Sequence, residues 1–396
     1  MYSNFEYYVP TRVLFGKGVE TQAGAAIRQA HGTRVLVHYS NSAKRSGLLE
    51  RVEHSLRDAG LPYCLLDGVV PNPHLGTVYE GIRLGLSEQV DFVLAIGGGS
   101  AIDSAKAIAC GIANPEEDVW SYYIRKGTTT KAIPVGCVPT IAAAGSEMSG
   151  GSVITNEANG LKRDFGGDFM RSVFALMNPD LTLSVSMYQT SSGAADILMH
   201  TMERFFNRCE NMAITDAISI AILKTVMSTA RTLMTDPQNE KARADLMWAG
   251  SLSHNDLTGC GTLGGDWATH NMEHELGDMF DVAHGAGLTA LWGSWARYVW
   301  ASAPERFYQF AVEVMDVENF GDVPLVVEQG IVAMENFFQE IHMPICLREL
   351  GISPTKEQIA FMAASCEEKA GGQNGVVRPL KKEDMIRIYH MAMGSE

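Results

Sequence analysis

The 396-residue sequence lacks several features that would place it in a specialised class. It has no Cys-x-x-Cys pair, no internal repeat, and no uninterrupted apolar run near the roughly 20 residues of a membrane-spanning helix. Its first residues contain no basic segment followed by an apolar one, so no signal peptide is expected. Lys and Arg number 31 against 46 Asp and Glu, which gives a net charge of −15. Nucleic acid and anionic membranes are therefore not expected as partners.

The residues that are present suit a folded globular protein. The chain is 46% hydrophobic and 19% charged, and it is long enough for about two to three domains. The cysteines are odd in number and scattered, which favours reduced thiols in a cytoplasmic protein over a disulfide framework. They are Cys64, Cys110, Cys137, Cys209, Cys260, Cys346 and Cys366.

Short apolar runs alternate with helical patterns over the first part of the chain. This alternation predicts a Rossmann-like α/β domain, with a parallel sheet covered by helices on both faces. Two later runs, at 152–155 and 172–176, look like the strands of a hairpin. The expected strands are 8–16, 33–39, 62–67, 91–96 and 133–139, and the expected helices are 19–30, 44–59 and 75–88.

The pattern changes near residue 185, after which strand signals disappear. We therefore expect a dinucleotide-binding α/β domain over residues 1–185 and an all-helical, metal-binding domain over residues 186–396. The helices expected in the second domain are 191–208, 211–235, 239–257, 262–280, 285–300, 304–314, 324–341, 355–368 and 382–393.

A glycine-rich turn follows the expected strand 91–96. Gly97, Gly98, Gly99 and Ser100 leave room for a pyrophosphate, and the first N–H groups of the next helix would bind its charge. The alternative is an ordinary tight turn from strand to helix. Residues 140–152, which are mostly small and polar, form either a second ligand-facing segment or a flexible loop.

Candidate metal ligands are concentrated in two helical segments. His270 and His274 are four residues apart and share a helix face, and His284 follows an expected helix break. Asp196 and His200 form a second pair with the same spacing. Imidazole and carboxylate groups on rigid helices are typical ligands of a divalent metal. Spacing alone leaves open which of the five bind and which metal they hold.

In this order, the motifs resemble the iron-containing (group III) alcohol dehydrogenases, in the branch of butanol dehydrogenases and broad-range aldehyde reductases. The resemblance covers nearly the whole chain. Its matching segments are residues 10–16, Gly97–Ser100 with Asp103 and Lys106, residues 145–147 and 178–180, Asp196 with His200, and the block from Trp267 to His284.

The resemblance implies hydride transfer between NAD(P)H and short- to medium-chain aldehydes or alcohols, in a homodimer or larger oligomer. It implies Fe²⁺ or Zn²⁺, with His274 beside the metal as a candidate proton relay or an orienting group. A departure from the family is that Ile141 and Ala144 stand where threonines are common. The implied metal ligands are Asp196, His200, His270 and His284, and the implied cofactor contacts include Asp103, Thr140, Ser149 and Lys162.

The end of the expected strand 33–39 bears on the choice of nucleotide. An acidic residue there would bind the ribose 2′-OH of NAD and repel a 2′-phosphate. The sequence instead has Ser40, Asn41 and Ser42, followed by Lys44 and Arg45. This favours NADP over NAD, although these residues could also simply cap a helix.

Three other functions fit parts of the pattern. A glycerol dehydrogenase-like polyol dehydrogenase would use Zn²⁺ and NAD, and the ligand-type residue His270 favours the iron-type branch over it. A dehydroquinate-synthase-like lyase would need several basic residues for an acidic substrate, and few lie near the histidine block. A non-enzymatic metal-binding protein would not need the glycine-rich turn.

Overall fold

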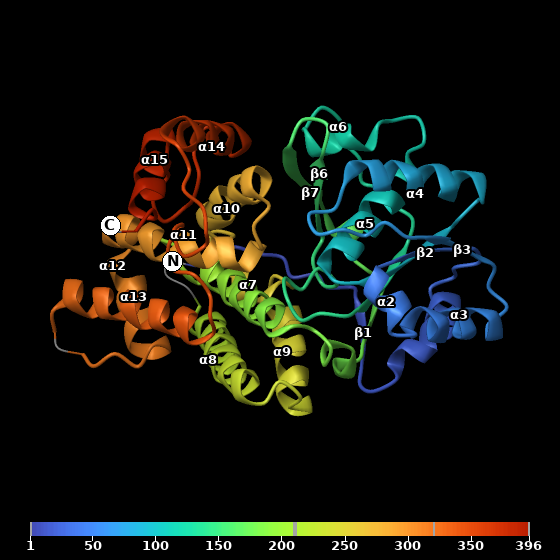
Figure 1. The fold of residues 1–396 in the computed structure, drawn as a ribbon, viewed down its shortest axis with the longest axis horizontal. Coiled ribbons are helices and arrows are strands. Elements are labelled where there is room, and N and C mark those ends of the chain that lie inside the picture. Colours follow the sequence, from blue (N-terminus) through green and yellow to red (C-terminus); the bar gives the residue numbers. More distant parts are fainter. Residues whose placement is uncertain (1, 209–211, 320, 395–396) are drawn as a thin grey trace. The chain divides into compact units, whose positions relative to one another are not determined.

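The computed structural model describes residues 2–208, 212–319 and 321–394. It divides into two compact units (Figure 1). One contains Tyr8–Val185, and the other begins at Ser186 and includes the N-terminal residues through Tyr7.

The unit Tyr8–Val185 is built on a parallel six-stranded sheet in the order β1-β8-β5-β4-β2-β3. The expected α/β fold is confirmed for this part of the chain. The strands of the sheet are β1 (Arg12–Phe15), β2 (Val35–Tyr39), β3 (Tyr63–Leu66), β4 (Phe92–Gly97), β5 (Val135–Pro139) and β8 (Phe174–Met177). The helices are α1 (Ala23–Gln29), α2 (Asn41–Arg45), α3 (Leu48–Asp58), α4 (Leu75–Ser87), α5 (Gly99–Ala113) and α6 (Val119–Tyr123).

The central strands are buried on both faces. Every residue of β2 and β4 is buried. Alternate side chains such as Val35, Val37 and Leu94 pack in one core with Val52 and Leu56 of α3. The intervening residues of these strands point to the opposite face of the sheet, which is covered by α4 and α5. This arrangement explains why these strands read as continuous apolar runs.

Two predictions for this unit were wrong. The helix expected at 44–59 is two helices, because Gly47 has the left-handed φ of 73° and precedes α3. The strand at 172–176 does not form a hairpin but lies in the main sheet as β8, parallel to β1 and β5. The partner of β6 (Gly151–Asn156) is β7 (Leu161–Gly166), across a turn that contains Gly160 at φ 65°.

The helices of the second unit follow the expected order. In the described residues they are α7 (Met187–Phe205), α8 (Ala213–Thr235), α9 (Glu240–Ser253), α10 (Ala268–Phe280), α11 (His284–Val299), α12 (Pro304–Gln309), α13 (Val323–Glu340), α14 (Lys356–Lys369) and α15 (Lys382–Met391). The pattern at 304–314 is completed by a π-helical turn, Phe310–Val314.

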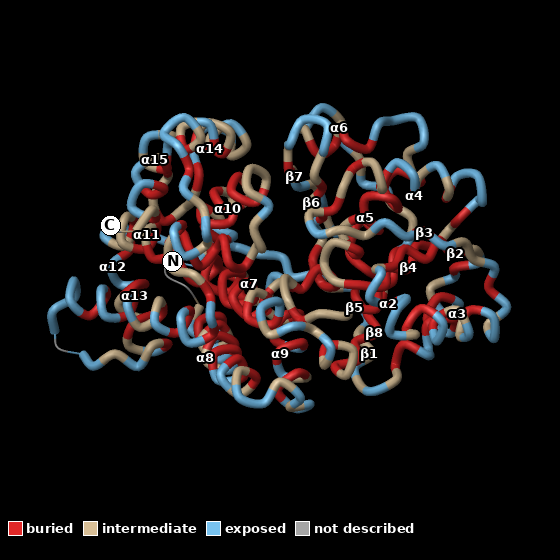
Figure 2. The backbone as a smooth tube through the Cα atoms, in the orientation of Figure 1, coloured by how far each residue is buried: buried red, intermediate tan, exposed pale blue. Residues whose placement is uncertain are grey.

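Helix α7 is the central element of this unit. Its residues from Gly193 to Phe205 are all buried (Figure 2). They include Asp196, His200 and Glu203. It packs against α8, α9 and α11. Its approach to α11 is close, because a Cβ at Gly285 would collide with the carbonyl oxygen of Ser192. Buried charged side chains need partners, so α7 indicates a polar site inside the unit.

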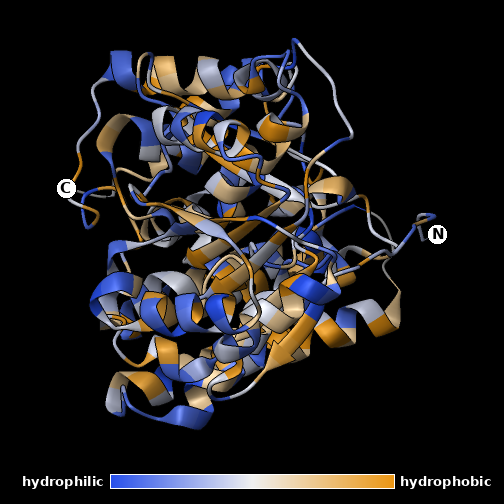
Figure 3. Ribbon diagram, turned by 90° about the vertical axis from the view of Figure 1, so that its right-hand side faces the viewer, coloured by the Kyte–Doolittle hydropathy of each residue, from blue (hydrophilic) through white to orange (hydrophobic). Residues whose placement is uncertain are grey.

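Most helices carry both polar and apolar residues (Figure 3). Helix α8 alone among the described helices is long and apolar enough to cross a membrane by length and composition, and half of that apolar window is buried inside the protein. A buried core helix passes the same test. The six described cysteines are free thiols, and Cys209 lies outside the described residues.

Candidate metal centre

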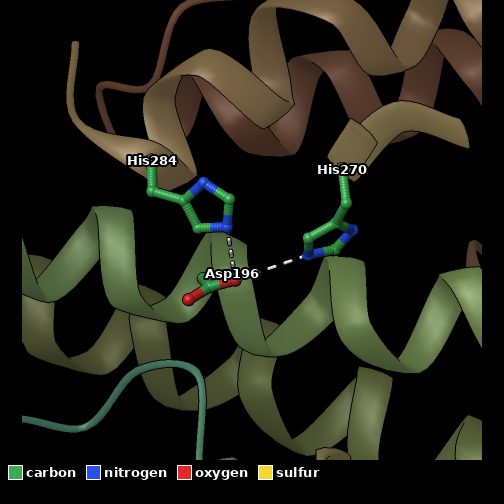
Figure 4. A group of neighbouring side chains, drawn as sticks. All are labelled: Asp196, His270 and His284. Atoms are coloured by element: carbon green, nitrogen blue, oxygen red, sulfur yellow. Dashed lines mark ion pairs between the residues drawn. The ribbon is translucent and has the colours of Figure 1, made fainter. Parts of the chain in front are cut away.

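Three helices bring the candidate ligands together. Asp196 and His200 lie one turn apart on α7, and His270 and His274 lie one turn apart on α10. Asp281 ends α10 in a left-handed conformation (φ 51°), and α11 then begins at His284. The break expected before His284 is therefore present, and it returns this histidine to the side of α7 (Figure 4).

Asp196 is the common contact of the other ligands. Its Oδ1 atom lies 3.8 Å from Nε2 of His270, 3.7 Å from Nε2 of His284 and 3.3 Å from Nδ1 of His200. One ligand atom each from Asp196, His270 and His284 lies within 4.8 Å of the other two. Since metal–ligand bonds of about 2.0–2.2 Å place ligand atoms at similar separations, one divalent cation fits among the three.

The hydrogen bonding of these atoms supports the same conclusion. Among the described residues, Asp196 Oδ1, His200 Nδ1 and His270 Nε2 are buried and have no hydrogen-bond partner. Buried polar atoms normally have one. Buried polar atoms that face one another without hydrogen bonds are suited to coordinating a cation, so the donor set fits a divalent metal.

Two buried carboxylates bind the opposite nitrogens of the rings. Glu203 Oε1 lies 3.0 Å from Nδ1 of His270, and Glu273 Oε2 is bonded to Nδ1 of His284. Burial disfavours a charged His270 ring, but the nearby carboxylates of Asp196 and Glu203 outweigh it and raise the pKa of His270 to about 9. Sequence analysis missed both glutamates.

His200 has a different environment. Its ring lies 4.0 Å from that of His254 and 4.6 Å from that of His270, centroid to centroid. Burial, followed by the proximity of His254 and His270, holds the pKa of His200 well below its usual value. This favours the neutral form of the ring, which is the form that binds a metal. His200 lies next to the group of three ligand atoms without belonging to it.

A strained tryptophan covers the ligands. Trp267 precedes α10 with the left-handed φ of 59°, which is uncommon for a bulky side chain. Its ring packs edge-on against His200 and His270, and the guanidinium of Arg204 lies 4.7 Å from its centroid. Trp267 Nε1 donates to the Gly264 carbonyl at 2.8 Å. These contacts hold the indole over two of the expected ligands.

His274 lies beside the metal ligands rather than among the three. Its ring stacks on that of His284, with centroids 5.5 Å apart. Its Nδ1 atom lies 2.7 Å from Nζ of Lys369, the last residue of α14. His274 therefore adjoins the candidate site, and Lys369 is a neighbour that sequence analysis did not find.

In the other unit, the predicted nucleotide residues meet at the carboxyl ends of β2, β4 and β5. The Ser40 N–H donates to Ile96 O at 2.9 Å, and the Thr140 N–H donates to Gly97 O at 3.0 Å. A Cβ on Gly97 would lie 2.7 Å from that of Ala101, and one on Gly98 would lie 2.7 Å from Ile141. The chain reverses its direction across the sheet between β2 and β4, where parallel sheets bind nucleotides.

The other residues predicted to contact the nucleotide bond to segments next to the carboxyl ends of these strands. Lys106 Nζ donates to the carbonyls of Ser146, Ser149 and Gly151 at 2.7–2.8 Å. Asp103 accepts from the Val153 N–H at 3.0 Å, so its carboxylate is engaged with β6. Burial raises the pKa of Asp103, against the opposing charge of Lys106. Lys162 lies on β7 and donates to Asn72 Oδ1 at 3.1 Å.

Comparison with known proteins identifies the family. Residues 10–179 match the model of iron-containing alcohol dehydrogenase, and residues 190–393 match the C-terminal model of the same family. The chain is 36% identical to NADH-dependent butanol dehydrogenase A of Clostridium acetobutylicum, over 98% of both chains. It is 32% identical to NADPH-dependent aldehyde reductase YqhD of Escherichia coli, over 98% of this chain and 100% of that one.

The fold agrees with these matches. The crystal structure of NADH-dependent butanol dehydrogenase A from Thermotoga maritima superposes with a TM-score of 0.94, at 32% identity over 99% of both chains. The chain therefore belongs to the iron-containing alcohol dehydrogenase family, in the branch of butanol dehydrogenases and aldehyde reductases, and is an NAD(P)-dependent oxidoreductase of alcohols and aldehydes.

Proposed function

We propose that this protein reduces short- and medium-chain aliphatic aldehydes with NADPH, using Fe²⁺ held by Asp196, His200, His270 and His284. The convergence of three nitrogens on Asp196 Oδ1 is the observation that carries the proposal. Zn²⁺ is the alternative ion for the same ligands. We further propose that the chain works as a cytoplasmic homodimer or larger oligomer, with Tyr8–Val185 as the nucleotide-binding domain and the helical unit as the metal-binding domain.

The chain's own residues have distinct parts in this reaction. When bound, the cation supplies Lewis acidity toward a carbonyl oxygen, and the nicotinamide supplies the hydride. Asp196 balances the charge of the cation within the buried site. His274, whose ring stacks on that of His284, is the proposed relay of a proton to the product oxygen, since an unperturbed imidazole titrates near neutral pH. Trp267 restricts the access of water from its side of the ligands.

The nucleotide is proposed from the end of β2. Gly97–Ser100 would bind the pyrophosphate at the N-terminus of α5, with Thr140, Ser149, Lys162 and Asp103 around it. Ser40 caps α2 through a bond from the Ala43 N–H at 3.3 Å, and no carboxylate follows Tyr39 before Lys44 and Arg45. Hydroxyl groups and positive charge at this place suit a 2′-phosphate.

The activity is tested by mixing the metal-loaded protein with NADPH and butyraldehyde and following the nicotinamide absorbance. We expect steady oxidation of NADPH that depends on Fe²⁺ or Zn²⁺ and is lost with a chelator. Metal analysis of protein prepared without oxygen identifies the ion. If no short or medium straight-chain aldehyde is reduced with either nucleotide, the proposed reaction is wrong.

The substitution Ser40→Asp tests the nucleotide. Aspartate is as good a helix N-cap as serine, so α2 should be retained while a negative charge is added. Like charges near a protein surface repel by about 1–4 kcal/mol, so we expect kcat/KM for NADPH to fall at least about tenfold. The value for NADH should change little. Ser40→Asn, which adds no charge, is the control, and equal losses for both nucleotides would contradict the assignment.

A further inference from the structure

We propose that Glu203 and Glu273 are positioning residues that fix the ring orientation and the protonated nitrogen of His270 and His284, so that both rings present a bare Nε2 atom to the metal. This inference rests on the proposed metal site and deepens it. It assigns a role to two buried acids that are not themselves among the proposed ligands.

Glu203 holds His270 at two points. Its Oε1 atom accepts from the backbone N–H of His270 at 3.2 Å and lies 3.0 Å from the ring Nδ1. A carboxylate can only accept, so Nδ1 must carry the hydrogen. In a neutral ring the other nitrogen is then unprotonated, and that nitrogen is the Nε2 atom that faces Asp196.

Glu273 holds His284 in the same way. Its Oε2 atom is bonded to Nδ1 of His284, and Nε2 of that ring faces Asp196. Helix α11 makes room for this carboxylate with a glycine, since a Cβ on Gly287 would lie 2.8 Å from Cγ and Oε1 of Glu273. His270 and His284 both face Asp196 through Nε2, and each is bonded through Nδ1 to a glutamate of its own.

The two pairs connect the three helices of the site in series. Glu203 lies on α7 and orients a ligand of α10, while Glu273 lies on α10 and orients a ligand of α11. Each glutamate is three residues after a ligand of its own helix, His200 or His270, so one helix face supplies both a ligand and an orienting group. A histidine bound in this way needs no reorientation when the metal enters, which strengthens binding.

The positioning role can be separated from a merely structural one. The side chain of Glu203 is 2% exposed and that of Glu273 is fully buried. Each carboxylate is bonded to a histidine ring, so removing it costs the metal-free protein the stability of that bond. A positioning residue also loses metal affinity beyond this cost, because the ring is no longer oriented for the metal. A residue that only supports the fold would lose stability with no change in the metal affinity of the folded protein.

The test measures metal affinity and stability on the full-length chain. The variants are Glu203→Gln, Glu203→Leu, Glu273→Gln and Glu273→Leu, and the dissociation constant of Zn²⁺ is obtained by competition with a chelator. Removing an orienting partner of a metal-bound histidine typically costs about 10–100-fold in affinity. We expect this loss for the leucine variants and a smaller one for the glutamine variants, whose amide oxygen can still accept from Nδ1. The absorption of bound Co²⁺ should also change, because the rings turn.

Two controls make the result specific. Glu20→Gln removes another buried acid, which is bonded to Arg51 and Asn178 in the α/β unit, and should keep wild-type affinity. Thermal unfolding of the metal-free variants reports the fold. Wild-type affinity in the variants, or a loss of metal-free stability that accounts for the weaker binding, would overturn the inference. If the leucine variants do not fold, the glutamine variants decide on the same criteria.

Asp196→Ala separates failure of the inference from failure of the proposed site. If this variant loses the metal while the glutamate variants retain it, the site stands and the positioning role is wrong. If Asp196→Ala binds Zn²⁺ as tightly as the wild type, the proposed site itself is wrong.

Discussion

Replacing Asp196 by alanine should remove the bound divalent metal and lower turnover with NADPH and butyraldehyde by at least about 1,000-fold. The Oδ1 atom of Asp196 is a contact shared by His200, His270 and His284, at 3.3–3.8 Å. Without it the remaining ligands are all neutral imidazoles, and the site loses the charge that compensates the cation. Lewis-acid stabilisation by a bound metal is worth several kcal/mol, which sets the size of the effect.

Metal content after dialysis and the rate of NADPH oxidation are the two measurements. Asp245→Ala is the matched control, since it removes an exposed aspartate from α9 in the same unit and should keep both metal and activity. His270→Ala should lose both, like Asp196→Ala. A variant at either position that retains full metal content and the wild-type rate would show that the ligand assignment is incorrect.

The fold could be predicted to a large extent because its patterns are local. Buried parallel strands read as apolar runs, and the helices from α7 to α15 follow amphipathic or uniformly apolar patterns with polar breaks between them. The errors occurred where a single residue ends a helix or where a strand pairs with a partner that is distant in the sequence. Gly47 interrupts a continuous helical pattern through its left-handed backbone, and the position of β8 depends on its pairing with β1 and β5. The dipeptide Asn159-Gly160, a common hairpin turn, could have identified the true partner of β6.

Only those parts of the candidate site that follow from the spacing of residues along one helix could be predicted. The pairs Asp196 with His200 and His270 with His274 are visible as four-residue intervals. Spacing cannot show that Asp196, His270 and His284 converge while His274 lies beside them, because that depends on the packing of three helices. Glu203 and Glu273 were missed for the same reason, although each stands three residues after a candidate ligand.

The substitution Lys106→Met should lower the melting temperature of the protein by roughly 6–20 °C and weaken NADPH binding. Lys106 is fully buried on α5, and its ammonium donates to the carbonyls of Ser146, Ser149 and Gly151. Burial lowers the pKa of Lys106, and the nearby Asp103 opposes that shift. Methionine fills much of the space but leaves three carbonyls without this donor and Asp103 without its counter-charge. Breaking a buried charge pair costs about 3–5 kcal/mol, which corresponds to the stated shift for a domain of this size.

The effect on the cofactor follows from the position of the anchored segment. Residues 146–150 directly precede β6 and lie beside the glycine-rich turn, where a Cβ on Gly99 would lie 3.1 Å from Ser146 Oγ. Loosening this segment should raise the dissociation constant for NADPH, measured by nicotinamide fluorescence, while metal content stays at the wild-type level because the ligands lie in the helical unit. Lys126→Met, at an exposed lysine of the same unit, is the control. A melting temperature within about 2 °C of the wild type for Lys106→Met would mean that this lysine does not hold the segment in place.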